Sequence, residues 1–146
     1  MNARSAPAIT GRCYCGARTF ASFEAPLTVA YCHCTDCRRV TGAPVAAFAA
    51  FREDAVRFSP DEGSTIRANP GVTRSFCTAC GSPLAGRYDY LPGQVYVAVG
   101  LIDQAESLAP EIHAHAENRL SWLTIEDDLE RCEMSARSSL NASAGP

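Results

Sequence analysis

Seven of the chain's eight cysteines fall into three tight clusters, and this spacing constrains the fold more than any other feature of the sequence. The clusters are Cys13 with Cys15, then Cys32, Cys34 and Cys37 together, then Cys77 with Cys80. Zinc holds four ligands tetrahedrally at zinc–sulfur distances of about 2.3 Å, which places the sulfurs about 3.8 Å apart. Cysteines separated by one or two residues at a bend satisfy this geometry. The clusters therefore predict metal sites that connect distant parts of the chain.

The two cysteine pairs have the features of two halves of one four-cysteine site. Gly16 follows Cys15 and Gly81 follows Cys80. A glycine in this place can adopt a positive φ and direct backbone N–H groups at the thiolates. We therefore predict a structural zinc on Cys13, Cys15, Cys77 and Cys80. A redox or disulfide role for the pairs, and a different partnering of the clusters, are the alternatives.

The three-cysteine cluster lacks such a glycine, because Arg38 and Arg39 follow Cys37. Three thiolates with an open fourth position are typical of a catalytic zinc, where water or substrate completes the coordination. We therefore predict a catalytic zinc on Cys32, Cys34 and Cys37, which gives two zinc ions per chain. The alternative is that the fourth ligand comes from the protein and the site is structural. Cys132, His113 and His115 are the candidates for that ligand.

Several other residues near this cluster are candidates for a role in the site. A helical turn over 35–42, capped by Thr35 or Asp36 and ended by Gly42, would favour a thiolate at its start. Arg38 and Arg39 are candidate substrate-binding residues for an anion, or they balance the thiolate charge. His33 lies between two ligands, so in extended chain it points away from the metal and packs behind it.

Composition narrows the class of protein. The 146 residues fit one domain, 47% hydrophobic and 20% charged, which is typical of a globular protein. The net charge of −3 argues against nonspecific nucleic-acid binding. The sequence contains no lysine, which excludes Schiff-base and Walker-type chemistry. No secretory signal or membrane-spanning run is evident, so we expect a cytoplasmic protein with no membrane partner, whose cysteines serve metal or redox chemistry.

The pattern along the chain predicts a mostly β fold in short pieces. Expected strands are 17–24, 27–31, 44–51, 55–58, 64–68 and 73–76, followed by a hairpin of 84–90 with 94–100. Residues 111–117 alternate, which would place His113 and His115 on one face, and 121–132 is a candidate helical turn. We expect one zinc-binding domain over 1–132 and a flexible tail over 133–146.

The chain resembles the glutathione-dependent formaldehyde-activating enzyme family, also called the centromere protein V domain, over roughly residues 8–131. The resemblance rests on GRCYCG (11–16), YCHCTDCRRVTGAP (31–44) and FCTACGSPL (76–84). It continues in VAVGLID (97–103) and at Pro110, His113, Arg119 and Trp122. The resemblance implies several small coiled antiparallel sheets pinned by zinc, with a few short helical turns. It also implies the two zinc sites assigned above.

The family resemblance further implies an activity: a carbon–sulfur lyase that joins formaldehyde to glutathione as S-hydroxymethylglutathione. An open three-thiolate zinc fits this chemistry, because it could hold a substrate sulfur as thiolate against the aldehyde carbon. The expected partner is thus a small glutathione-like thiol. The competing hypotheses are a zinc-stabilised binding module without catalysis and a thiol redox protein using Cys77 and Cys80.

Overall fold

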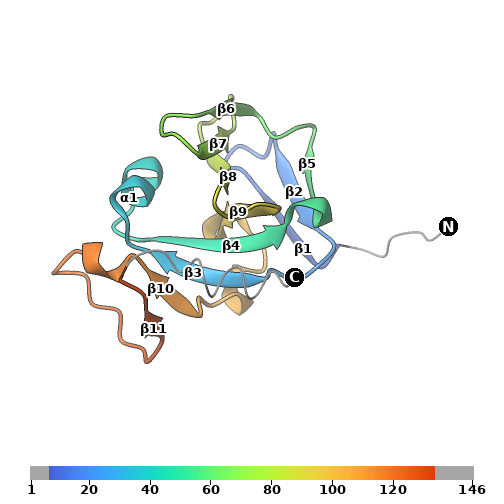
Figure 1. Ribbon diagram of the computed structural model, residues 1–146. Helices are drawn as coiled ribbons and strands as arrows, with labels where there is room; N and C mark the ends of the chain where they lie inside the picture. Colours follow the sequence, from blue (N-terminus) through green and yellow to red (C-terminus); the bar gives the residue numbers. More distant parts are fainter. Residues whose placement is uncertain (1–6, 134–146) are drawn as a thin grey trace.

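The computed structural model describes residues 7–133, which fold into two β-sheets and one short α-helix (Figure 1). The strands are β1 (Ile9–Arg12), β2 (Thr19–Ser22), β3 (Thr28–Cys32), β4 (Ala46–Arg52), β5 (Val56–Ser59), β6 (Ser64–Ile66), β7 (Val72–Phe76), β8 (Pro83–Tyr88), β9 (Gln94–Ala98), β10 (Ile112–Ala114) and β11 (Glu130–Arg131). The helices are α1 (Thr35–Thr41) and the 3-10 turns η1 (Glu53–Ala55), η2 (Val99–Leu101), η3 (Ala105–Ser107) and η4 (Ala116–Asn118).

The two sheets differ in size and in the part of the chain they use. The smaller has the order β1-β2-β5, and the larger has the order β11-β10-β3-β4-β9-β8-β7-β6. All pairings are antiparallel except those of β10, which runs parallel to both β3 and β11. The prediction of a mostly β fold of antiparallel sheets with few helical turns is confirmed. The parallel pairings are an addition that the sequence pattern did not indicate.

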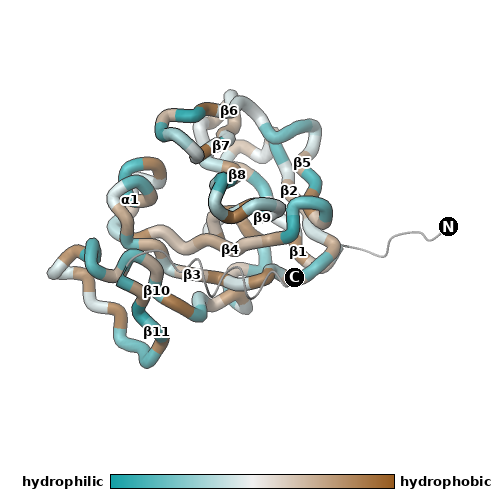
Figure 2. The backbone as a smooth tube through the Cα atoms, viewed as in Figure 1, coloured by the Kyte–Doolittle hydropathy of each residue, from teal (hydrophilic) through white to brown (hydrophobic). Residues whose placement is uncertain are grey.

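The hydrophobic core follows the central strands of the larger sheet. In β4, Ala49, Ala50 and Phe51 have no exposed surface, so both faces of this strand are covered. Val95 and Val97 of β9 are equally buried beside it. Strands buried on both faces show nearly continuous apolar runs, as β4 does. In Figure 2 the tube is mostly brown to white along β3, β4 and β10 and teal in the loop between β6 and β7.

Most of the predicted strands are present, with ends that move by a few residues. The 84–100 hairpin is confirmed as β8 and β9. The helical turn predicted within 121–132 is wrong, because these residues form a turn, an irregular stretch and then β11. Of the predicted tail, all but Glu133 lies outside the described residues. Within residues 7–133, no helix is long and apolar enough to cross a membrane.

Candidate metal and substrate site

Two loops from different sheets bring four cysteine sulfurs together. Cys13 and Cys15 lie in the connection between β1 and β2, and Cys77 and Cys80 lie between β7 and β8. The Cys13 and Cys15 sulfurs are 3.7 Å apart, and the Cys15 and Cys77 sulfurs are 3.9 Å apart. All four lie within 4.8 Å of one another. These separations match the edges of a zinc–thiolate tetrahedron, so the four residues fit a metal ion.

The backbone of each loop supports this cluster in the way that the glycine spacing predicts. Gly16 and Gly81 both have φ of 81°, a left-handed conformation that glycine adopts without strain. Three backbone N–H groups point at cluster sulfurs, those of Ala17, Arg18 and Ala79, at 3.4, 3.3 and 3.4 Å. Such donors stabilise thiolates over thiols. The two loops therefore form similar half-sites that face each other.

Side chains add further stabilisation of negative charge at the four-cysteine cluster. The Nη1 atom of Arg18 lies 3.9 Å from the sulfur of Cys77, and its other terminal nitrogen pairs with Asp61 at 3.0 Å. The hydrogen bond to Asp61 raises the pKa of Arg18, with burial acting against it. The hydroxyl of Ser82, 3.2 Å from the sulfur of Cys80, lowers the pKa of that thiol to about 5. The surroundings thus favour the thiolate, the form that binds metal, at Cys80.

The second cluster gathers three sulfurs at the start of α1. Cys32 ends β3, Cys34 is the N-cap of α1, and Cys37 is buried within the helix. The prediction that Thr35 or Asp36 caps this helix is wrong, because the sulfur of Cys34 accepts the N–H of Cys37 at 3.2 Å. The predicted end of the helix is confirmed: Gly42 has φ of 72° and its N–H reaches the Arg38 carbonyl.

This helix cap also defines the geometry of the three-cysteine cluster. The sulfurs of Cys32 and Cys34 are 3.4 Å apart, and all three sulfurs lie within 4.8 Å of one another. Hydrogen bonds from the thiols of Cys32 and Cys37 lower the pKa of Cys34 to about 2, with burial acting against them. The cluster therefore holds a thiolate at neutral pH, which fits a metal ligand.

No fourth ligand atom from the described residues joins this cluster within the same 4.8 Å limit. The Cys132 sulfur contacts the Glu130 carboxylate instead, at 3.6 Å. His113 is buried and turns its ring toward His33. The prediction that His113 and His115 share a strand face is wrong, because His115 follows β10 with φ of 54° and lines the cavity beside the cluster.

That cavity has a volume of about 240 Å³ and opens directly on the three cysteines. Its lining residues come from α1, from β7 and β8, and from β4 among other elements, and Figure 1 shows α1 on one side of β4 and β7 and β8 on the other. Its walls are mostly apolar and aromatic, from Ala30, Phe48, Val72, Tyr88, Tyr90, Leu91, Tyr96 and Ala114. Asp36, Arg74 and His115 add one acidic and two basic side chains to this lining. The cluster thus forms one end of a concave site, as ligand-binding metal centres require.

Arg74 is a candidate functional residue that the sequence analysis missed. Its guanidinium carbon lies 5.6 Å from the centre of the Tyr88 ring. Burial acts to lower the pKa of Arg74, but the Tyr88 hydroxyl and the Cys37 thiol raise it above the ordinary value. One sequence signal was available, because alternation in β7 places Arg74 on the same face as Val72 and Phe76. A charged residue between two apolar ones on one face indicates a buried cation.

The two arginines that the sequence indicated lie elsewhere. Arg38 and Arg39 line a separate depression on α1 together with Thr35, Pro44 and Leu120. Neither lines the cavity next to the three cysteines. Their contact with substrate stays a prediction.

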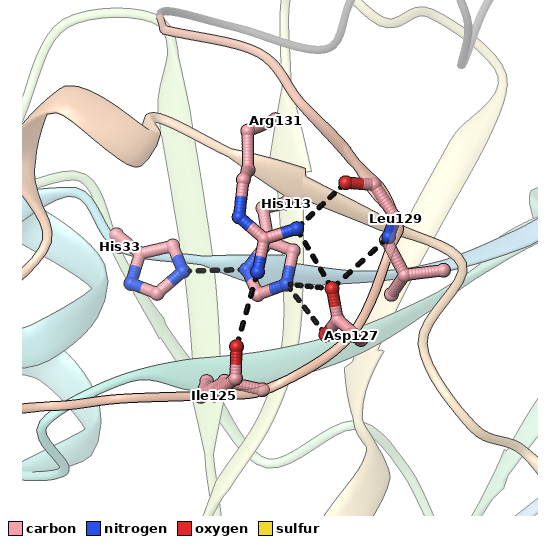
Figure 3. Close-up of polar contacts among 6 residues, drawn as sticks. All are labelled: His33, His113, Ile125, Asp127, Leu129 and Arg131. Carbon is pink, nitrogen blue, oxygen red and sulfur yellow. Dashed lines mark hydrogen bonds and ion pairs between the residues drawn. The ribbon is translucent and has the colours of Figure 1, made fainter.

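A chain of polar contacts, buried at one end and partly exposed at the other, runs from His33 to Arg131 (Figure 3). The Nε2 atom of His33 is 2.9 Å from Nδ1 of His113, and Nε2 of His113 is 2.9 Å from Oδ2 of Asp127. Arg131 completes the chain, with Nη1 at 2.7 Å from Oδ1 of Asp127. The expectation that His33 packs behind the ligands is confirmed, since it has no exposed surface.

The contacts of this chain assign its protons. The Asp127 carboxylate can only accept, so His113 donates through Nε2 and accepts at Nδ1 from His33. Burial, together with the nearby His113, lowers the pKa of His33 to about 4, which keeps His33 neutral at pH 7. Because His33 lies between Cys32 and Cys34, these hydrogen bonds connect the three-cysteine cluster to the segment that holds Asp127 and Arg131.

Comparisons with known proteins agree with this geometry. The model of a family described as glutathione-dependent formaldehyde-activating enzyme matches residues 8–118. A comparison with curated proteins gives no match. A crystal structure of a Rhodobacter sphaeroides protein is similar at 19% identity, covering 84% of this chain and 98% of that chain with a TM-score of 0.53, which supports the fold alone. Since the family model spans both cysteine clusters, the chain belongs to the glutathione-dependent formaldehyde-activating enzyme family.

Proposed function

We propose that this protein is a zinc-dependent carbon–sulfur lyase that acts on adducts of small thiols with aldehydes. The single observation that carries the proposal is the three-cysteine cluster at the end of an open cavity, with no fourth protein ligand among the described residues. Family membership adds glutathione and formaldehyde as the reference pair of substrates. A reducing compartment such as the cytoplasm would keep the seven cluster thiols available.

The two clusters would have different roles. Zinc on Cys13, Cys15, Cys77 and Cys80 would have all four positions filled by protein and would join the two sheets. Cys32, Cys34 and Cys37 would hold the second zinc with one position left for substrate. Bound there, zinc would supply the means of keeping a substrate sulfur as thiolate at neutral pH.

The side chains around the cavity would supply the other catalytic contributions. The reaction joins the thiol sulfur to the aldehyde carbon; the carbon–oxygen π bond opens, and the oxygen takes up the proton that the thiol released. Arg74, beside Cys37, is the cation placed to stabilise the developing negative charge on that oxygen. The apolar walls exclude water and so strengthen this interaction. In the reverse direction the same residues cleave the carbon–sulfur bond.

Exchange spectroscopy by NMR tests the proposal, because the adduct forms readily without a catalyst and only an acceleration is informative. Zinc-replete protein should speed the exchange between free glutathione with formaldehyde and S-hydroxymethylglutathione. Cys37→Ser should abolish the acceleration, while Cys132→Ser, a cysteine outside both clusters, should keep it. Normal acceleration by the Cys37 variant would refute the assignment of the cluster. Absence of acceleration by the wild type with glutathione would exclude glutathione as the thiol, and absence with other small thiols as well would favour a non-catalytic binding module.

A further inference from the structure

The residues that line the cavity indicate which class of thiol the protein binds. This inference rests on the proposed function. Phe48, Tyr96 and Leu91 line it and are only 9%, 6% and 2% exposed. Tyr88 contacts both Tyr96, with ring centres 5.3 Å apart at 76°, and Tyr90, at 5.9 Å. The cavity is thus walled by aromatic rings that already pack on one another.

Polar groups that could bind a peptide are few in this wall. The hydroxyl of Tyr96 donates to Oε1 of Gln94 at 2.5 Å. The hydroxyl of Tyr88 lies next to the guanidinium of Arg74, since a Cβ atom placed on Gly86 would meet both. These hydroxyls therefore already have protein neighbours. A polar ligand would lose its water without gaining equal partners, which is costly.

The cavity has too few strong cations for glutathione, which carries two carboxylates and one ammonium group. Arg74 is the one arginine among the described residues that line the cavity, and the chain has no lysine. Arg74 lies beside Cys37, at the reacting end. At the rim, Asp36 accepts a hydrogen bond from Asn69 at 2.8 Å and would repel a further carboxylate.

The volume fits a ring. An apolar cavity of about 150 Å³ holds benzene, and this one measures about 240 Å³. A second cavity of about 200 Å³ shares Phe48, Arg74 and Tyr96 with the first and adds apolar neighbours such as Ile66 and Leu84. The space beside the cysteines therefore continues as an apolar surface.

We propose that the thiol whose aldehyde adduct this protein makes or cleaves has an uncharged aromatic or bulky apolar body. The body lies against Phe48, Tyr88 and Tyr96, with the sulfur at the three-cysteine cluster and the adduct oxygen toward Arg74. Aromatic contacts supply the affinity, and the lack of a second arginine or a lysine in the wall that the described residues form selects against dicarboxylate thiols such as glutathione.

Calorimetric titration of full-length, zinc-replete protein tests this with phenylmethanethiol, its charged analogue 4-(mercaptomethyl)benzoate, and glutathione. We expect phenylmethanethiol to bind at least about tenfold more tightly than either charged thiol. Tyr90→Ser, at the mouth of the cavity, should weaken phenylmethanethiol by about threefold to tenfold. Tyr14→Ser, which changes a 92% exposed tyrosine outside the cavity, should leave it unchanged.

The Cys37→Ser variant separates the two proposals. Tighter binding of phenylmethanethiol that is lost in this variant supports the inference. Glutathione binding as tightly or more tightly, and also lost in the variant, overturns the inference and leaves the proposed function standing. No binding of any thiol, or binding that persists in the variant, overturns both.

Discussion

Replacement of His113 by phenylalanine offers the sharpest test of the buried contacts behind the three-cysteine cluster. His113 is 1% exposed and stacks on Tyr31 at 4.7 Å between ring centres. Phenylalanine keeps the ring and this stacking but removes both nitrogens. The Nε2–H of His33 then stays buried without an acceptor. Asp127 keeps its ion pair with Arg131 and partial access to solvent, so losing the His113 hydrogen bond costs it less.

The expected loss of stability follows from the buried N–H donor that is left without an acceptor. A buried donor left without a partner costs about 1–3 kcal/mol, so His113→Phe should lower the free energy of unfolding by about that amount. The double variant His33→Phe/His113→Phe leaves no orphaned group between the two rings. It should therefore lose less stability than the sum of the single variants, with a coupling of about 1–2 kcal/mol. Urea denaturation of zinc-replete protein at pH 7 measures all four species.

The same variant should also affect the metal. Because His33 lies between Cys32 and Cys34, loosening its ring should speed zinc release from the three-cysteine cluster. Release from the four-cysteine cluster should not change. A competing chromophoric chelator resolves the two phases. Unfolding within about 0.5 kcal/mol of wild type, or strictly additive single variants, would show that the histidine contact does not support the loop.

Three further outcomes follow from described contacts. Gly63→Ala should lower the free energy of unfolding in urea far more than Gly93→Ala does. Both glycines have positive φ, but only at Gly63 would a Cβ atom overlap the Phe76 carbonyl, so Gly93→Ala should cost only about 1 kcal/mol. Equal losses in the two variants would contradict this explanation. The hydrogen bond from His113 lowers the pKa of Asp127 from 3.8 to about 2. The ionised Asp127 therefore stabilises the fold fully above pH 3.8, and this contribution disappears as the pH falls through about 2. The stability difference between wild type and Asp127→Asn should shrink over that range, and a constant difference would refute the assignment. Removal of zinc by a chelator should lower the melting temperature, and less so at lower pH, because protonation of the thiolates weakens zinc binding and so reduces the stability that the metal contributes. An unchanged melting temperature at neutral pH would argue against structural zinc.

The cysteine clusters could be predicted because their geometry is local. Cys13 with Cys15, and Cys77 with Cys80, are each set by one bend and one glycine, and only the joining of the bends is non-local. The strands were likewise readable from short apolar runs. Glycine also marked the end of α1 correctly, because few other residues adopt its left-handed cap.

The unpredicted features depend on contacts between distant residues. His33 and His113 are 80 positions apart, and nothing near either one indicates the other. The helical turn expected within 121–132 does not form because Arg131 holds the segment in another path, donating to the carbonyls of Ile125 and Leu129 at 3.1 and 2.7 Å. Cys34 replaced the expected cap because a sulfur atom accepted the N–H group usually taken by an oxygen.

The four-cysteine cluster also has a consequence for the unfolded chain. Its sulfurs join Cys15 to Cys77, 62 positions further along. If zinc stays on these thiolates after unfolding, the denatured chain is closed into a large loop. A covalent cross-link of that length would remove about 4 kcal/mol of chain entropy from the denatured ensemble. The metal would then stabilise the native state partly by restricting the conformations of the unfolded chain. The free energy of unfolding should therefore depend less steeply on urea concentration with zinc than with a chelator.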